Sequence, residues 1–249
     1  MTSTALITGA TAGIGAATAR RLAADGWQMV ITGRRADRLS ELKDELGAQC
    51  HALALDMRDQ AALSAVLGQL PAPFAGIDLL VNNAGLAPPM DALQDADMAA
   101  LANAIDTNVT GLVALTRAML PRLIERKGAV INLSSVAATY PYRGAAVYAA
   151  SKAFVRQLSL DLRCDLAGTG VRVTSIEPGM VETEFTLVRN GGDQDASDAL
   201  YADMDPMSAD DIANTIHWVA TLPPHLNINA LELMPVRQSW AGFTVTRKG

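Results

Sequence analysis

The sequence predicts an α/β fold in which a parallel sheet carries helices on both faces. Short apolar stretches alternate with longer amphipathic stretches along the chain, which is typical of repeated strand–helix–strand units. Most apolar stretches lack the strict alternation of a half-exposed strand, as expected for strands that are covered on both sides. A glycine-rich turn also separates the first apolar stretch from the first amphipathic one.

Strands are expected where short apolar segments end in polar residues or glycine. Seven segments fit this description: 4–8, 28–32, 50–56, 77–83, 128–135, 171–178 and 227–234. Helices are expected from the glycine turn to about Asp25, over 36–47, between 56 and 77, and near 98–126, 146–167 and 208–221. The sequence therefore predicts a doubly wound, seven-stranded parallel sheet with helices on both faces.

A single domain, residues 1–249, accommodates these elements, because no linker divides the chain. The stretch 189–206 is polar, contains glycine and is weakly periodic. We therefore expect an insert at about 184–206, mobile rather than part of the core, and a C-terminal tail at about 235–249.

Charge and composition exclude several classes of protein. The net charge of -6 argues against a nucleic-acid binder, which would carry a basic face. The first residues lack the basic and apolar regions of a signal peptide, and no apolar run reaches the length of a membrane span. We expect a cytoplasmic protein that does not bind membranes.

The cysteines and histidines give no sign of a metal site. Cys50 and Cys164 are too few for a disulfide framework, and they do not form a metal-binding pair. His51, His217 and His225 share no ligand spacing, so we interpret them as structural and expect no metal.

The glycine-rich turn predicts a nucleotide site. Gly9, Gly13 and Gly15 follow the first strand with the spacing GxxxGxG, and Thr8 and Thr11 accompany them. Glycines allow the backbone to approach a pyrophosphate whose charge lies at a helix N-terminus. A plain strand–helix turn would need one glycine, so three favour a Rossmann-type dinucleotide site.

The residues after the second strand favour NADP over NAD. An NAD enzyme places a carboxylate there for the ribose hydroxyl, whereas this chain has Arg34 and Arg35. Guanidinium groups bind a 2′-phosphate through charge-assisted hydrogen bonds, although arginines at a helix start are also often only solvated. Asp56, after the third strand, is a candidate for the adenine amino group. Further along the same sheet edge, the adenine ribose is expected beside Asn82, Asn83, Ala84 and Gly85.

Six motifs in order resemble the short-chain dehydrogenase/reductase family over essentially the whole chain. They are TGxxxGxG at 8–15, NNAG at 82–85, Asn108, Ser135, YxxxK at 148–152 and PGxxxT at 178–183. Within that family, the segments KAFVRQLSLDLR, TLPPHLNIN and PVRQSWAGFTVTRKG look like those of NADP-dependent 3-hydroxy acid dehydrogenases.

The resemblance implies a catalytic tetrad. Tyr148 is the expected acid/base, Ser135 orients the substrate oxygen, and Asn108 holds a water that relays protons to Lys152. An ammonium about 5 Å away, at an effective dielectric constant of about 20, contributes roughly 3 kcal/mol, which lowers the pKa of a phenol by roughly two. Burial opposes this effect, but we expect Lys152 to make Tyr148 more acidic. Lys152 also holds the nicotinamide ribose.

The resemblance also completes the expected cofactor contacts. They are Thr8, Gly9, Thr11, Gly13, Ile14, Gly15, Arg34, Arg35, Asp56, Met57, Asn83, Ala84, Gly85, Tyr148, Lys152, Pro178, Gly179, Val181 and Thr183.

A 3-hydroxy acid needs a cation for its carboxylate, and Arg189 in the insert and Arg143 before the tyrosine are the candidates. Tyr140 and Tyr142 are expected to shape the pocket. Trp240 and Phe243 in the tail either close the pocket or contact another subunit.

The predicted function is hydride transfer between NADP(H) and a small anionic 3-hydroxy acid of the serine, allo-threonine or 3-hydroxypropionate type. The same arginines suit a sulfonate, so sulfoacetaldehyde reduction remains an alternative. Reduction of a carrier-bound 3-oxoacyl group, docked on Arg126, Lys127 and Arg172, is a weaker alternative. A non-catalytic NADP-binding protein is disfavoured because all four tetrad residues are present. The family further implies a homotetramer.

Overall fold

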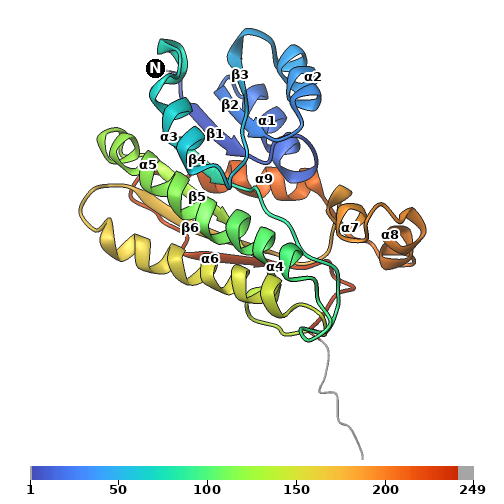
Figure 1. Ribbon diagram of the computed structural model, residues 1–249. Coiled ribbons are helices and arrows are strands. Elements are labelled where there is room, and N and C mark those ends of the chain that lie inside the picture. Colours follow the sequence, from blue (N-terminus) through green and yellow to red (C-terminus); the bar gives the residue numbers. More distant parts are fainter. Residues whose placement is uncertain (1, 241–249) are drawn as a thin grey trace, which may run out of the picture.

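The computed structural model, which describes residues 2–240 apart from two side chains at positions 64 and 66, contains a seven-stranded sheet (Figure 1). The strand order is β3-β2-β1-β4-β5-β6-β9, and every pairing is parallel. The strands are β1 (Thr4–Thr8), β2 (Gln28–Gly33), β3 (Cys50–Ala54), β4 (Leu79–Asn82), β5 (Ala129–Leu133), β6 (Arg172–Pro178) and β9 (Ala230–Leu233). The predicted Rossmann-type sheet is thus confirmed, although β3, β4, β5 and β9 are shorter than expected.

The predicted helices also form, with small differences at their ends. They are α1 (Gly13–Ala24), α2 (Ala36–Leu46), α3 (Gln60–Gly68), α4 (Met98–Ile105), α5 (Leu112–Arg126), α6 (Ala146–Asp165) and α9 (Ala209–Ala220). Residues 2–240 also contain short 3₁₀ turns at η1 (Gly47–Gln49), η2 (Ala72–Phe74) and η4 (Val136–Ala138).

Helices cover both faces of the sheet, so its inner strands are buried on both sides, whereas the edge strands β3 and β9 are partly exposed. Along β1, Ala5 and Ile7 pack in one core cluster with residues of α1, α2 and α9, whereas Leu6 packs in a second cluster with residues of α3, α5 and α6. All three side chains are fully buried. This double coverage explains why the strands read as continuous apolar runs rather than alternating ones.

α4 and α5 form one continuous helix, with a π-helical turn, η3 (Asp106–Gly111), between them. By length and composition alone, the stretch Met98–Arg126 is apolar enough to cross a membrane, which the sequence analysis did not anticipate. Its inner side chains Leu115, Met119 and Leu123 are fully buried in the core beneath the sheet. Core helices of soluble proteins meet the same criterion.

The expected insert at 184–206 is helical rather than irregular. It contains α7 (Glu184–Arg189) and α8 (Gln194–Tyr201), and lies between the short strands β7 (Val181–Glu182) and β8 (Met207–Ser208), which pair with each other. The Thr183 and Asp193 side chains accept hydrogen bonds from the first turns of α7 and α8, respectively. In Figure 1 these two helices lie beside the main body.

Candidate active site

The predicted site residues gather at the carboxyl ends of the parallel strands, where the chain order reverses between β1 and β4. Thr8 ends β1, Asn82 ends β4 and Pro178 ends β6, while Ser135 follows β5 by two residues. Open α/β sheets bind ligands at such a switch point.

The glycine loop packs closely against its neighbours. Gly9 and Gly13 have positive φ angles of 66° and 52°, which favour glycine. A side chain at Gly9 or Gly15 would lie within 3.0 Å of Asn83 Nδ2, and one at Gly13 would lie 3.3 Å from the Thr183 Cβ. No side chain in the described region caps α1 at Ala12. The first amides of this helix are therefore available for the phosphates of a dinucleotide.

Thr8 and Asn83 hold the loop against β4. The Thr8 hydroxyl accepts hydrogen bonds from the backbone amides of Asn83 (3.0 Å) and Ala84 (2.9 Å). The Asn83 amide group donates to the carbonyls of Thr8 (2.8 Å) and Gly9 (3.2 Å). These two side chains therefore shape the nucleotide site through the backbone.

Other predicted cofactor residues surround this core of the site. Ile14 and Val181 are partly buried against the first core cluster, and Met57 is buried in the second. The Gly179 amide donates to the Leu233 carbonyl (2.7 Å). Asp56 is engaged by Arg58, whose guanidinium lies 2.6 Å from its carboxylate and lowers its pKa.

The arginines expected to bind a 2′-phosphate lie beside the glycine loop. Arg35 donates to the Thr11 hydroxyl from Nε (3.2 Å) and Nη2 (2.9 Å), and from Nη1 to Glu184 (2.9 Å). Arg34 is exposed. Arg38, which the sequence analysis missed, lies one turn further along α2 and also donates to Glu184 (2.7 Å). Its i+3 spacing from Arg35 is a signal that could have identified it.

Tyr148 and Lys152 lie one turn apart on α6, and both are buried, with 8% and 6% of their surface exposed. The Lys152 Nζ atom lies 5.9 Å from the centre of the Tyr148 ring and donates to the Leu133 carbonyl (2.7 Å). A side chain at Gly85 would lie 3.3 Å from this nitrogen, so the glycine keeps the space beside it open.

The pKa expected for Tyr148 is wrong for the free protein. Burial raises the pKa of its phenol to about 12, with a further rise from Tyr142, while Ser135 and Arg189 act in the opposite direction. Burial also lowers the pKa of Lys152 to about 8. Desolvation disfavours both charged forms and outweighs the attraction between phenolate and ammonium on which the expectation relied.

Two adjacent serines follow β5, and their hydroxyls have different partners. Ser134 donates to the Lys152 carbonyl (2.7 Å), which ties it to the α6 backbone. Ser135 donates to the Pro178 carbonyl (3.3 Å) and accepts from the Ala137 amide (3.1 Å). Ser135 also acts to lower the pKa of Tyr148.

Asn108 lies in the π-helical turn, which is a helix irregularity often found at functional sites. Its amide nitrogen donates to the Leu86 carbonyl (2.8 Å) and the Ser151 hydroxyl (3.0 Å), and its oxygen accepts from the Leu86 amide (2.9 Å). The side chain is therefore fixed in orientation next to Lys152. Its expected role in a proton relay stays a prediction.

Of the two candidate anion-binding arginines, only Arg189 lies next to Tyr148. Its Nε donates to the Pro88 carbonyl (3.2 Å) and its Nη1 to the Tyr142 hydroxyl (3.3 Å). The guanidinium carbon lies 5.7 Å from the ring centres of both Tyr142 and Tyr148. Its Nη2 is buried and lacks a hydrogen-bond partner within residues 2–240. Arg143 is exposed and forms no hydrogen bond or ion pair with any residue in that range.

Two aromatic residues, one at the start of the insert and one at the end of the described chain, pack against tyrosines. Phe185 lies 5.9 Å from the Tyr148 ring, and Thr183 caps its helix by accepting from the Phe185 amide (3.3 Å). Trp240 stacks on Tyr140 with ring centres 4.9 Å apart. Phe243 lies outside the described residues.

The histidines have separate surroundings. His51 stacks on Phe74 with ring centres 5.5 Å apart, and His217 contacts Asp25 and Arg21. Within the part of the chain that the structure describes, no cluster of three or more His, Cys, Asp or Glu side chains has a metal-site arrangement.

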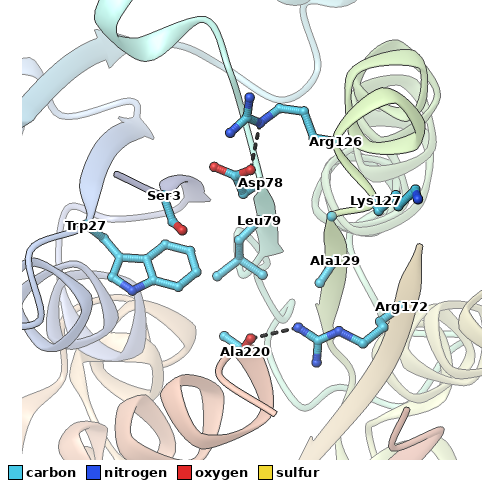
Figure 2. Close-up of a pocket in the computed structure, with 10 residues that line it drawn as sticks. Ser3, Trp27, Asp78, Leu79, Arg126, Lys127, Ala129, Arg172 and Ala220 are labelled. Carbon is cyan, nitrogen blue, oxygen red and sulfur yellow. Dashed lines mark hydrogen bonds and ion pairs between the residues drawn. The ribbon is translucent and has the colours of Figure 1, made fainter. Parts of the chain in front are cut away.

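A separate cavity of about 190 Å³ lies at the opposite end of the sheet, at the amino ends of β4, β5 and β6. Figure 2 shows Arg126 turned toward Asp78 and Arg172 toward Ala220. The first pair is an ion pair of 2.6 Å, and the second is a hydrogen bond of 2.7 Å to the end of α9. Two of the three cations considered for carrier docking are therefore engaged within the protein.

Comparisons with known proteins agree with this geometry. A family model described as short chain dehydrogenase matches residues 3–194. The chain is 59% identical to a serine 3-dehydrogenase of Rhizobium radiobacter over 100% of both chains. It is 54% identical to sulfoacetaldehyde reductase 2 of Chromohalobacter salexigens, over 99% of this chain and 100% of that protein. A solved closed form of serine dehydrogenase complexed with NADP⁺ is 49% identical, covers 98% of this chain and 100% of its own, and superimposes with a TM-score of 0.97.

Proposed function

This chain belongs to the short-chain dehydrogenase family, and we propose that it transfers a hydride between NADP(H) and a small 3-hydroxy acid or the corresponding carbonyl acid. The substrates in question are of the serine, allo-threonine or 3-hydroxypropionate type. An acidic substrate is favoured mainly by Arg189, whose guanidinium lies beside Tyr148. Its Nη2 atom is buried and has no hydrogen-bond partner in residues 2–240.

The residues at the switch point fit NADP. The free amides of α1 and the backbone of the glycine loop suit the pyrophosphate, and Thr11, Arg34 and Arg35 suit a 2′-phosphate. NADPH, when bound, supplies the hydride. Lys152 is placed to hold the nicotinamide ribose, because the Gly85 backbone leaves space beside its ammonium.

Tyr148 carries the proton. Its raised pKa keeps the phenol neutral near pH 7, so it can donate a proton to the substrate oxygen during reduction. During oxidation the same oxygen must accept the proton, which the neutral phenol does poorly until a positive charge lowers its pKa. Ser135 is adjacent and suited to orient the substrate oxygen, since its neighbour Ser134 is tied to the α6 backbone.

Arg189 binds the substrate anion. A carboxylate next to the nicotinamide loses water, and this is costly unless a cation replaces the lost hydrogen bonds. The guanidinium is already held by the Pro88 carbonyl and the Tyr142 hydroxyl, so little side-chain freedom remains to be lost. A carboxylate at Nη2 would give this buried donor its partner.

The test is NADP-linked turnover with serine, allo-threonine, 3-hydroxypropionate, 3-hydroxyisobutyrate and isethionate. We expect the carboxylic acids to be oxidised with higher kcat/KM than isethionate. The reverse order would favour sulfoacetaldehyde reduction, the second candidate, which the 54% identity to such a reductase supports. Turnover of none of the five would refute the proposal.

A carrier-bound substrate is less well supported, because Arg126 and Arg172 are engaged by Asp78 and by α9. A non-catalytic role is disfavoured, because all four tetrad residues are present and Tyr148 and Lys152 lie side by side.

We also propose that the protein forms a homotetramer, the assembly that the family resemblance implies. Large apolar side chains remain exposed on the long helix at Met98 (71%) and Ile105 (43%), and on α6 at Phe154 (39%). Self-association would bury them. Light scattering at micromolar concentration should give four times the mass of the chain, and a monomer would refute this assembly.

A further inference from the structure

Glu184 bridges the two arginines beside the glycine loop. Its Oε2 lies 2.9 Å from Arg35 Nη1, and its Oε1 lies 2.7 Å from Arg38 Nη1. These three side chains are 37–42% exposed, so the pairs are open to competition by other anions. Arg38 and then Arg35 hold the pKa of Glu184 below its usual range, so the carboxylate is charged at neutral pH.

The bridge uses the donors that a 2′-phosphate would need. Arg35 directs Nε and Nη2 to Thr11 and Nη1 to Glu184, so all three of its nitrogens are engaged. These contacts use three of the five N–H groups of the guanidinium, so a phosphate that forms two parallel hydrogen bonds with Arg35 shares at least one nitrogen with Thr11 or Glu184. Two anions on the same guanidinium also repel each other, whereas the Thr11 hydroxyl carries no charge, so Glu184 is the partner that gives way.

Glu184 is the first residue of α7, the helix that ends with Arg189. Six helical residues span about 9 Å, which separates the two ends of this short helix. The start of the helix also contacts both the glycine loop and Tyr148. Thr183 lies against Gly13 of the glycine loop, and Phe185 lies 5.9 Å from the Tyr148 ring.

We propose that Glu184 is a positioning residue that couples recognition of the cofactor 2′-phosphate to the placement of α7. In the free protein the carboxylate occupies Arg35 and Arg38. Binding of the 2′-phosphate releases it, and the first turn of α7, which carries Phe185 beside Tyr148, moves. Arg189, at the other end of the helix, stays held by the Pro88 carbonyl and the Tyr142 hydroxyl. The inference rests on the proposed function, and adds Arg38 to the phosphate-binding arginines. It implies that NADP(H) prepares the substrate site in a way that NAD(H) does not.

The test uses adenosine 2′,5′-bisphosphate, which carries the 2′-phosphate but no nicotinamide, and ADP as the ligand without that phosphate. Hydrogen–deuterium exchange is measured for the segment 184–190, and affinity is measured by calorimetry. In the wild-type protein, the bisphosphate should change exchange in this segment at least threefold, and ADP should not.

Glu184→Gln keeps the shape of the side chain and removes its charge. We expect this variant to bind the bisphosphate about three- to tenfold more tightly, and its exchange in segment 184–190 to change little on binding. Glu182→Gln, two residues earlier on an exposed side chain, is the matched control and should behave as wild type. Arg38→Gln should weaken binding of the bisphosphate but not of ADP.

Weaker binding of the bisphosphate by Glu184→Gln would overturn the inference, because it would mean that the carboxylate orients the arginines for phosphate. Equal effects of ADP and the bisphosphate on α7 would overturn it as well. Both outcomes leave the proposed reaction intact. A wild-type protein that fails to bind the bisphosphate would instead refute the NADP site itself.

Discussion

Arg189→Met tests the assignment of the substrate anion to a single side chain. Methionine keeps the unbranched length of the arginine stem and removes the guanidinium. The change deletes the hydrogen bonds to the Pro88 carbonyl and the Tyr142 hydroxyl, together with the buried Nη2. Because α7 is capped by Thr183 at its other end, the helix should persist.

The expected magnitude follows from the contact that is lost. A hydrogen bond to a charged group contributes about 1.5–3 kcal/mol, and about 1.4 kcal/mol corresponds to a factor of ten. The kcat/KM for an acidic substrate should therefore fall roughly ten- to a hundredfold or slightly more, mainly through KM. Arg189 also lowers the Tyr148 pKa, so its loss should move the pH profile of oxidation to higher pH.

The assay compares 3-hydroxypropionate with 1,3-propanediol, in which a neutral alcohol replaces the carboxylate. Only the acid should lose kcat/KM strongly, while the small pH effect should appear with both. Arg143→Met, at an exposed arginine, is the matched control and should resemble wild type. Equal losses on both substrates, or no loss on either, would show that Arg189 does not bind the anion.

Four further predictions concern the proton, the buried ammonium and the cofactor. Tyr148→Phe should abolish turnover yet leave NADPH binding, followed by fluorescence, nearly intact; near-normal kcat would remove Tyr148 from the chemistry. Because the Tyr148 pKa is raised to about 12, alcohol oxidation should accelerate from pH 7 to pH 10, and a rate that falls over this range would contradict the assignment. The Lys152 pKa falls from 10.5 to about 8 on folding, so the unfolded chain binds more protons between these values. Urea denaturation of Lys152→Met should therefore give an unfolding free energy up to about 3 kcal/mol higher than wild type at pH 7. This gain should vanish above pH 10.5. A gain that stays the same across this pH range would show that it does not come from the titration of Lys152. Replacing Arg34 and Arg35 by alanine should weaken NADP binding roughly ten- to a hundredfold with little effect on NAD, by calorimetric titration, and equal wild-type affinity for both cofactors would contradict the role of these arginines.

Much of the fold could be predicted from local patterns. The seven strands follow from apolar runs such as 4–8, and the burial of the inner strands follows from the absence of alternation. The glycine spacing at 9, 13 and 15 also predicted a turn whose φ angles are positive at two of its three glycines. The insert was harder to interpret, since its helices are short and depend on caps at Thr183 and Asp193 more than on periodicity.

The candidate site was predictable where neighbours in sequence supply the geometry. Tyr148 and Lys152 are four residues apart on one helix, so their proximity is a local property of α6. The different roles of the adjacent Ser134 and Ser135 are not local, because Ser134 donates to the Lys152 carbonyl of another element.

The sequence by itself determined the elements, the order of the motifs and the kind of chemistry, because these depend on residues within a few positions of one another. Only the tertiary structure decided that the Tyr148 pKa rises, that Arg189 rather than Arg143 reaches the site, and that Glu184 meets Arg38 across 146 positions of sequence. Desolvation sums the packing of distant segments around one atom, and a long-range ion pair exists only once the chain has folded. Neither quantity can be read from a residue's immediate neighbours in the sequence.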